Sequence, residues 1–169
     1  MRRSRPVPIV MSKLTHLDEK GRARMVDVSE KDVTVRRAVA RGVLQMESGT
    51  LSRILEGDMP KGDVLSVART AGIMAAKRTA ELIPMCHPLP IDSVEIEISA
   101  DGDRRLRIDA VVQVTARTGV EMEALTAASI AALTVYDMCK SVDRSMQVTQ
   151  VALLEKSGGR SGNWLRRDD

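Results

Sequence analysis

Two short segments of this sequence combine a lysine with an acidic side chain in a way that suits acid–base or phosphate chemistry. Asp137 and Lys140 are three residues apart, so on a helix they share a face and each perturbs the pKa of the other. The same spacing also describes an ordinary surface ion pair. Lys61, with Gly62 and Asp63, precedes a predicted helix, where backbone N–H groups and a lysine together bind anions. A solvated lysine beside a helix cap is the alternative for this segment.

Cys86 and His87 lie in a proline-rich segment, residues 84–90. Pro88 restricts the backbone of His87, and a histidine held in one direction can bind a ligand or exchange a proton near neutral pH. A structural turn with a half-buried histidine explains the pattern equally well. Cys86 by itself is typical of a small buried hydrophobe.

Carboxylates and cations also flank the last third of the chain. Glu121 and Glu123 lie on either side of Met122 at the start of a predicted helix, where one can cap the helix while the other contacts a ligand. Residues 156–162 (KSGGRSG) offer two cations among glycines and serines. Such a loop can wrap a phosphate group, although its composition equally fits a flexible C-terminal segment.

One long helix, predicted over residues 119–140, carries these charged groups at both ends. Its apolar residues fall on two faces, so we expect it to be buried on two sides; a capped core helix with solvated ends is the alternative. Glu123 and Asp137 are about 14 residues apart, and a rise of about 1.5 Å per residue separates them by about 21 Å. They can serve one ligand only if it is long or if the site is shared between two chains.

The rest of the pattern predicts the elements that must position these residues. In chain order they are a short strand over 23–28, a strand over 33–44, a short helix over 49–55, a long helix over 64–83, a hairpin of strands over 93–99 and 106–115, the long helix over 119–140, and a last strand over 147–154. Asp63 is predicted to cap the helix over 64–83, and Pro84 to stop it. In the strand over 33–44 the valines share one side, which Arg37 and Arg41 interrupt, so helix stays open for part of it.

Strand, helix, hairpin, helix and strand is the order of a ferredoxin-like split βαβ fold in the α+β class. We expect an antiparallel sheet with two long helices on one face. The other face of such apolar strands would be exposed unless another subunit covered it, so the sequence predicts an oligomer.

Composition excludes several classes of protein. The 169 residues are 43% hydrophobic, which fits one domain with a real core. The chain has no Phe, one Trp and one Tyr, and a net charge of only +3, so neither base stacking nor a broad basic face for nucleic acid is indicated. Two cysteines and two histidines cannot build a Cys-rich zinc motif. No signal peptide or membrane span is visible, which predicts a cytoplasmic protein.

Seven segments carry a resemblance to a known family: LTHLDEKGRARMVDVS, KGDV, AGIMAAKRT, LIPMCHPL, TGVEMEALTAAS, YDMCK and KSGGRSG. Together they resemble the molybdenum cofactor biosynthesis protein C family, the cyclic pyranopterin monophosphate synthases. The resemblance covers residues 14–162 and implies a single catalytic domain there, between a flexible arm at 1–13 and a flexible tail at 163–169. It implies a ferredoxin-like fold and a homohexamer, a trimer of dimers, with active sites between subunits.

The resemblance also implies a reaction. A cyclised dihydroguanosine triphosphate (3′,8-cyclo-7,8-dihydro-GTP), made by a radical GTP cyclase, is converted to cyclic pyranopterin monophosphate with release of pyrophosphate by general acid/base catalysis. No redox cofactor is implied. Mg²⁺ can accompany the triphosphate or pyrophosphate, although the sequence shows no dedicated metal cage. A non-catalytic nucleotide-binding or regulatory module on the same fold is the alternative.

The family's functional positions carry over to matching residues of this chain. Asp137 is the implied general acid/base, and Lys140, Lys61 and His87 complete the implied catalytic set. The implied substrate-binding residues are Met85, Cys86, His87, Glu121, Met122, Glu123, Arg36 and Lys156, of which Arg36 and Lys156 match positions that handle phosphates. The family usually has leucine at the position of Met85.

Overall fold

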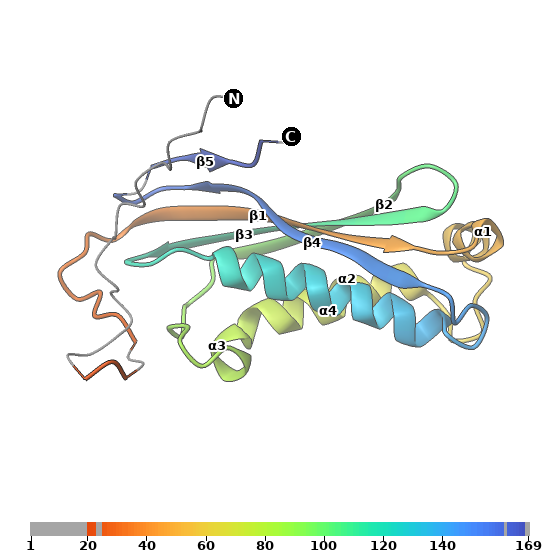
Figure 1. Cartoon of the computed structure of the whole chain (residues 1–169), viewed down its shortest axis with the longest axis horizontal. Coiled ribbons are helices and arrows are strands. Elements are labelled where there is room, and N and C mark those ends of the chain that lie inside the picture. Colours follow the sequence, from red (N-terminus) through yellow and green to blue (C-terminus); the bar gives the residue numbers. More distant parts are fainter. Residues whose placement is uncertain (1–19, 23–24, 161, 168–169) are drawn as a thin grey trace, which may run out of the picture.

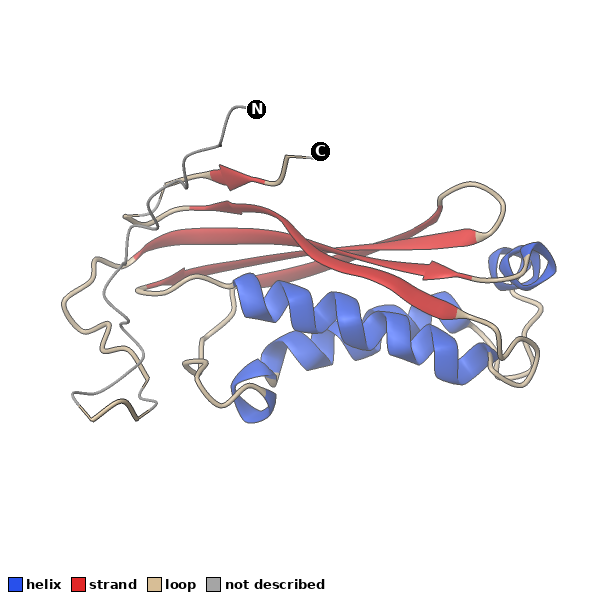
Figure 2. Cartoon of the chain, in the orientation of Figure 1, coloured by secondary structure: helices blue, strands red, loops and turns tan. Residues whose placement is uncertain are grey.

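The computed structural model describes residues 20–22, 25–160 and 162–167. Its elements are β1 (Thr34–Gln45), α1 (Ser48–Glu56), α2 (Val64–Lys77), α3 (Thr79–Leu82), β2 (Ser93–Ala100), β3 (Arg105–Ala116), α4 (Glu121–Cys139), β4 (Gln147–Ser157) and β5 (Trp164–Leu165). The strands form one sheet in the order β2-β3-β1-β4-β5, and every neighbouring pair is antiparallel. The sheet is one layer, and α2 and α4 form a second layer against one of its faces (Figure 1; Figure 2). This confirms the predicted α+β, ferredoxin-like class.

The core lies between the sheet and α4. The alternating apolar residues of β3 are all fully buried: Leu106, Ile108, Ala110, Val112 and Val114. α4 packs on β1, β3 and β4 and also on α2, so it is buried on two sides as predicted. Small residues permit this double packing. A Cβ added to Gly72 of α2 would lie only 2.9 Å from the carbonyl oxygen of Ala127. None of the described helices combines the length and the apolarity needed to cross a membrane.

β1 is the middle strand of the five, and residues 34–45 are strand throughout, so the helical alternative is wrong. Its alanines, rather than its valines, face the core: Ala38 and Ala40 are fully buried, whereas Val35 is 55% exposed. Small side chains on this face let the helical layer approach the backbone closely. The side of β1 that the sequence marked as apolar is therefore the open face of the sheet.

Charged pairs cover much of that open face along β1. Arg37 donates to Glu155 on β4 at 2.7 Å, and Arg41 donates to Asp109 on β3 at 2.6 Å. These cross-strand pairs satisfy the arginines beside the valines. An apolar open face is thus not a sufficient reason to expect an oligomer.

The long helix predicted over 64–83 is divided. α2 ends at Lys77, Arg78 leaves the helical conformation with φ −111° and ψ 13°, and the four-residue α3 follows. The Thr79 hydroxyl donates to the carbonyl oxygens of Ala75 and Ala76, at 3.3 and 3.0 Å. A hydroxyl bonded back to the preceding turn competes with regular helix hydrogen bonding and helps to bend the chain here.

The structure also differs from the prediction at the two ends of the described chain. The short strand predicted over 23–28 is absent from residues 25–28, and residues 23–24 lie outside the described part, as does the predicted arm at 1–13. β4 continues to Ser157, three residues beyond its predicted end. The sequence predicted no strand after it, yet Trp164 and Leu165 form β5 by pairing with Lys156 and Glu155.

A buried aspartate in the loop between α4 and β4 holds α1 in place. Asp143 is 7% exposed and accepts hydrogen bonds from the backbone N–H of Glu47, at 2.9 Å, and from the hydroxyl of Thr50, at 3.2 Å. Its other oxygen accepts from Ser145, from the backbone N–H at 2.8 Å and from the hydroxyl at 2.6 Å. Asp143 therefore ties the residue before α1 and the first turn of α1 to a distant part of the chain.

Candidate active site

Two adjoining cavities lie where α4 begins. The first, of about 650 Å³, is bounded by the start of β1, the residues before α4 and the glycine loop after β4; we call it the basic pocket. The second, of about 430 Å³, is bounded by the proline-rich segment and the first turn of α4; we call it the carboxylate pocket. They share Lys31, Thr118, Gly119 and Glu121, so they are adjacent to each other.

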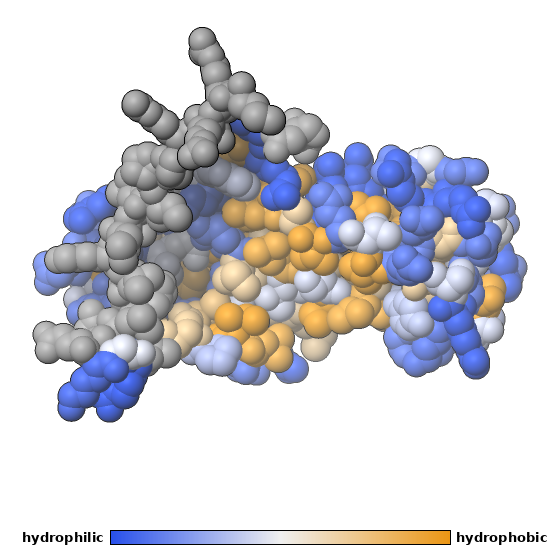
Figure 3. All heavy atoms as spheres, viewed as in Figure 1, coloured by the Kyte–Doolittle hydropathy of each residue, from blue (hydrophilic) through white to orange (hydrophobic). Residues whose placement is uncertain are grey.

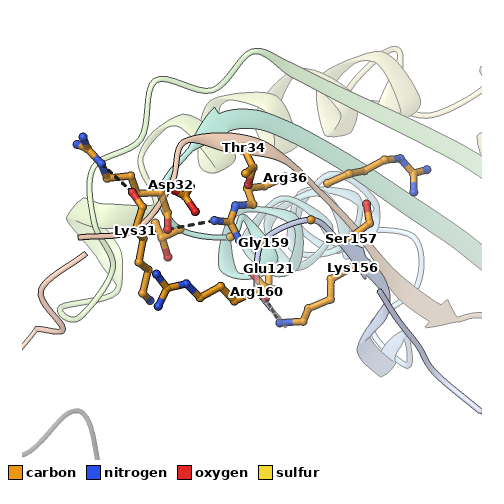
Figure 4. Close-up of a pocket in the computed structure, with 14 residues that line it drawn as sticks. Lys31, Asp32, Thr34, Arg36, Glu121, Lys156, Ser157, Gly159 and Arg160 are labelled. Atoms are coloured by element: carbon orange, nitrogen blue, oxygen red, sulfur yellow. Dashed lines mark hydrogen bonds and ion pairs between the residues drawn. The ribbon is translucent and has the colours of Figure 1, made fainter. Parts of the chain in front are cut away.

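Cations dominate the basic pocket. Six basic side chains line it, against two acidic ones, Asp32 and Glu121. The six are Lys31, Arg36, Arg37, Arg117, Lys156 and Arg160. Figure 4 shows most of them drawn together around the glycine loop. This balance favours an anionic ligand with several charges.

Arg36 is oriented by backbone carbonyl groups of the neighbouring strand and the residue after it. Its Nε donates to the carbonyl oxygen of Ala116, and its Nη2 donates to that of Arg117, both at 3.3 Å. The antiparallel pairing of β1 with β3 brings those carbonyls beside it. Gly158 and Gly159 have positive φ angles of 95° and 70°, and a Cβ on Gly159 would overlap the Arg36 guanidinium. Two glycines in succession therefore let the loop pass directly over the arginine.

The carboxylate pocket contains a buried acid. Glu123 is only 4% exposed, and burial, with a smaller effect from the Glu121 charge, raises its pKa. Burial also raises the pKa of the neighbouring Cys86 thiol, and the Glu123 charge adds to the rise. A carboxyl with a raised pKa in a pocket can exchange a proton closer to neutral pH than an exposed one.

His87 is held at the other wall of this pocket. Its Nε2 lies 2.9 Å from the carbonyl oxygen of Val26. A carbonyl only accepts, so Nε2 carries the hydrogen, and in the neutral ring Nδ1 is left as an acceptor. The imidazole is thus oriented by the backbone, as the flanking prolines suggested.

A third cluster lies at the opposite end of α4. Lys61, just before α2, donates to the carboxylate of Asp137 at 2.9 Å and to its carbonyl oxygen at 2.9 Å. Lys140 donates to the other carboxylate oxygen at 2.5 Å. The hydrogen bonds from Lys140 and then Lys61 lower the pKa of Asp137 to about 2. The aspartate is therefore ionised at neutral pH, which suits a proton acceptor or an orienting group, while the ammonium groups are the available donors.

The structure thus separates the expected site residues into two groups. The two pockets bring together Met85, Cys86, His87, Glu121, Met122, Glu123, Arg36 and Lys156. Lys61, Asp137 and Lys140 form the cluster at the far end of α4, about 21 Å away along the helix at about 1.5 Å per residue. Within one chain the two groups do not meet.

Three cations that line the site were missed from the sequence, namely Lys31, Arg37 and Arg117. Lys31 borders both pockets, and the Nε of Arg117 donates to the Lys31 carbonyl oxygen at 3.2 Å. Arg117 stands two residues before Gly119, just ahead of a helix start. A cation beside exposed helix N–H groups was the available signal for it.

Among the described residues, no group of three or more His, Cys, Asp or Glu side chains is placed to hold a metal ion. Cys86 and Cys139 are both free thiols.

The fold and the paired pockets define a class: a ferredoxin-like α+β domain with two adjoining cavities, one of them lined mainly by cations. Residues 25–159 match the MoaC family. A cyclic pyranopterin monophosphate synthase from Thermomicrobium roseum is 61% identical over 160 residues, 94% of this chain and 96% of that protein.

Two further relatives agree with this match. Cyclic pyranopterin monophosphate synthase 3 of Mycobacterium bovis is 61% identical over 155 residues, 92% of this chain and 88% of that protein. The cyclic pyranopterin monophosphate synthase of Roseiflexus sp. is 59% identical over 156 residues, 92% of this chain and 99% of its own length. The chain belongs to the MoaC family.

Proposed function

We propose that this protein is a cyclic pyranopterin monophosphate synthase of molybdenum cofactor biosynthesis. It converts 3′,8-cyclo-7,8-dihydro-GTP, supplied by a radical GTP cyclase, to cyclic pyranopterin monophosphate and pyrophosphate. The observation that carries the proposal is the pairing of a basic pocket with a carboxylate pocket, in a chain about 60% identical to proteins of that name.

The pockets suit the two halves of such a substrate. The six cations of the basic pocket match a triphosphate, and they would stabilise the charge that develops on departing pyrophosphate. Glu121 and Glu123 suit the N–H groups of a guanine-derived ring, and His87 offers a ring nitrogen for proton transfer. Mg²⁺ bound to the phosphates remains compatible with this arrangement, since a phosphate-bound ion keeps most of its ligands from water and substrate.

We further propose that each active site combines two subunits of a homohexamer built as a trimer of dimers. In one chain, the Lys61–Asp137–Lys140 cluster lies at the opposite end of α4 from the pockets. A partner subunit that presents this cluster to the pockets would supply the missing proton donors, Lys61 and Lys140. The cytoplasmic location also stays a prediction from the sequence.

The direct test is turnover. The purified protein is given freshly prepared 3′,8-cyclo-7,8-dihydro-GTP, and cyclic pyranopterin monophosphate and pyrophosphate are measured, the first by mass. We expect equal amounts of the two products, and none when GTP replaces the cyclised compound. Tight binding of the cyclised triphosphate without either product would instead favour the non-catalytic nucleotide-binding module.

A further inference from the structure

One ion pair joins the two pockets. Lys156, which lines the basic pocket, donates to Glu121 at 2.9 Å, and Glu121 lines both pockets. Their side chains are 30% and 29% exposed. Figure 4 shows the Lys156 side chain extending from the end of β4 to Glu121 at the start of α4.

The charge of each partner is compensated by the other. A phosphate oxygen that binds Lys156 must therefore compete with the Glu121 carboxylate, and a heterocyclic N–H donor that binds Glu121 must compete with the Lys156 ammonium. Arg36 differs in this respect, because its guanidinium donates to two backbone carbonyls and is already held in place.

We propose that the Glu121–Lys156 ion pair is a specificity determinant that selects ligands carrying phosphate oxygens and heterocyclic N–H donors in one molecule. Such a ligand replaces both partners of the pair at once. Inorganic polyphosphate can bind Lys156, but Glu121 then loses its cationic partner and lies beside additional negative charge, which is unfavourable. A heterocycle without phosphates leaves Lys156 without its anion.

The consequence is discrimination against one of the products. This part rests on the proposed function, in which pyrophosphate is released into a pocket rich in cations. Without a competing carboxylate, such a pocket would retain pyrophosphate and slow the next turnover. When the heterocyclic product has dissociated, the ion pair between Glu121 and Lys156 forms again. It competes with pyrophosphate for Lys156 and so weakens product inhibition.

The first test measures pyrophosphate binding to the folded protein by calorimetry. We expect Glu121→Gln to bind pyrophosphate about two- to five-fold more tightly than wild type, the range that loss of a partly exposed ion pair supports. Asp32→Asn is the matched control, since Asp32 lines the same basic pocket and is not the partner of Lys156. It removes the same charge and should have a smaller effect. Unchanged or weaker binding in Glu121→Gln, or an equal gain in Asp32→Asn, overturns the inference.

The second test is the mirror image and guards against a misfolded first variant. Lys156→Gln leaves Glu121 available to N–H donors, so guanosine should bind about two- to five-fold more tightly than to wild type. Tighter pyrophosphate binding by this variant, or weaker guanosine binding, contradicts the pair's role.

Neither binding test requires turnover, so the two ideas can fail separately. If the binding shifts are as expected but no product forms, the role of the ion pair in ligand selection is supported and the proposed reaction is wrong. Product formation without the binding shifts would retain the reaction, and in that case Glu121→Gln would show the same inhibition by pyrophosphate as wild type.

Discussion

The lysines around Asp137 decide which proton-transfer roles this aspartate can fill. They lower its pKa to about 2, so it remains a carboxylate at every pH suitable for an activity assay. An acid limb in the pH profile of activity must then come from another group, and Glu123, whose pKa is raised chiefly by burial, is the candidate in the pockets.

Replacing Asp137 with asparagine tests this assignment. We expect Asp137→Asn to lower kcat by about 10²- to 10⁴-fold, the usual contribution of a positioned proton-transfer group, with little change in melting temperature because the site is exposed. Steady-state kinetics and a thermal melt measure both quantities. Asp103→Asn, in the exposed turn between β2 and β3, should behave as wild type. Full turnover by Asp137→Asn would remove the residue from the mechanism.

Glu123 should destabilise the protein while serving the site. Its folded-state pKa is raised above 4.5 by burial, so the folded form favours the protonated acid. The stability from this group is fully present below the unfolded pKa and is lost as pH rises through the folded pKa. We therefore expect Glu123→Gln to raise the melting temperature at pH 7 by roughly 2–4 °C, equivalent to about 1 kcal/mol for this size of chain, while activity falls.

The pH dependence provides the control for that prediction. At pH 4 both proteins carry a neutral side chain at this position, so their melting temperatures should nearly coincide. A stability difference that is the same at pH 4 and pH 7 would mean that packing, and not ionisation, separates the two proteins.

Single residues were predictable from the sequence where the partner was close along the chain. The Asp137–Lys140 pair follows directly from its three-residue spacing, and its formation is confirmed. The contact of Lys61 with the same carboxylate joins residues 76 positions apart, and no local pattern contains that information. Lys31 and Arg117 escaped notice for the same reason, since they enter the basic pocket only after β1 pairs with β3.

At the scale of elements, the close contact between α2 and α4 is the feature with the clearest energetic consequence. A methyl group at Gly72 would press on the Ala127 carbonyl and on the side chain of Ile96. We expect Gly72→Ala to destabilise the fold by about 1–3 kcal/mol through overpacking, measured by denaturant unfolding.

A second glycine supplies the matched control. Gly49 lies in α1, and an added Cβ there meets nothing within 4 Å. Gly49→Ala should stabilise the protein by about 0.5–1 kcal/mol, because alanine loses less backbone entropy in a helix. Equal effects at the two positions would contradict the packing explanation.

The order and type of the long elements were predictable because hydrophobic periodicity reports them directly. β3 alternates without a break, and α4 carries its small residues on both buried sides. The break at Arg78 was not predictable, since Thr79 is compatible with a helix until its hydroxyl bonds back to Ala75. The hydrogen bonds of Asp143 with Glu47 and Thr50 join segments more than 90 residues apart, and β5 forms only by pairing with β4.

At the scale of the whole molecule, the surface around α4 and β4 is notably apolar. Figure 3 shows hydrophobic residues gathered across the middle of this face, with hydrophilic ones at the end near α1. Leu133 on α4 and Val148 and Val151 on β4 are 53%, 38% and 42% exposed. Apolar surface of this kind is typical of contacts between subunits, and it supports the proposed oligomer better than the charged open face along β1 does.

Subunit mixing tests whether sites are shared. Asp137→Asn alters the far end of α4, and His87→Ala alters the carboxylate pocket, so each protein alone should be nearly inactive. If two chains build each site, a mixed dimer contains one doubly altered site and one intact site. Unfolding and refolding the two variants together should then restore a substantial fraction of wild-type turnover, up to half for each mixed dimer.

If each site is instead made within one chain, both variants disable their own sites, and mixing them would restore no turnover. Two preparations of Asp137→Asn, refolded in the same way, provide the background. Size-exclusion chromatography with light scattering then confirms that the mixed material has the mass of the wild-type assembly.

α4 carries a charged cluster at one end and the wall of two pockets at the other, with an alanine-rich shaft between them. If the two ends contribute to different active sites of an assembly, the length of α4 fixes the distance and the rotation between those contributions. An inserted residue would advance one end by about 1.5 Å and turn it by about 100° relative to the other. Insertions and deletions among such chains should therefore be found in turns such as the one between β2 and β3, where a change of length does not alter the relative position of two functional groups.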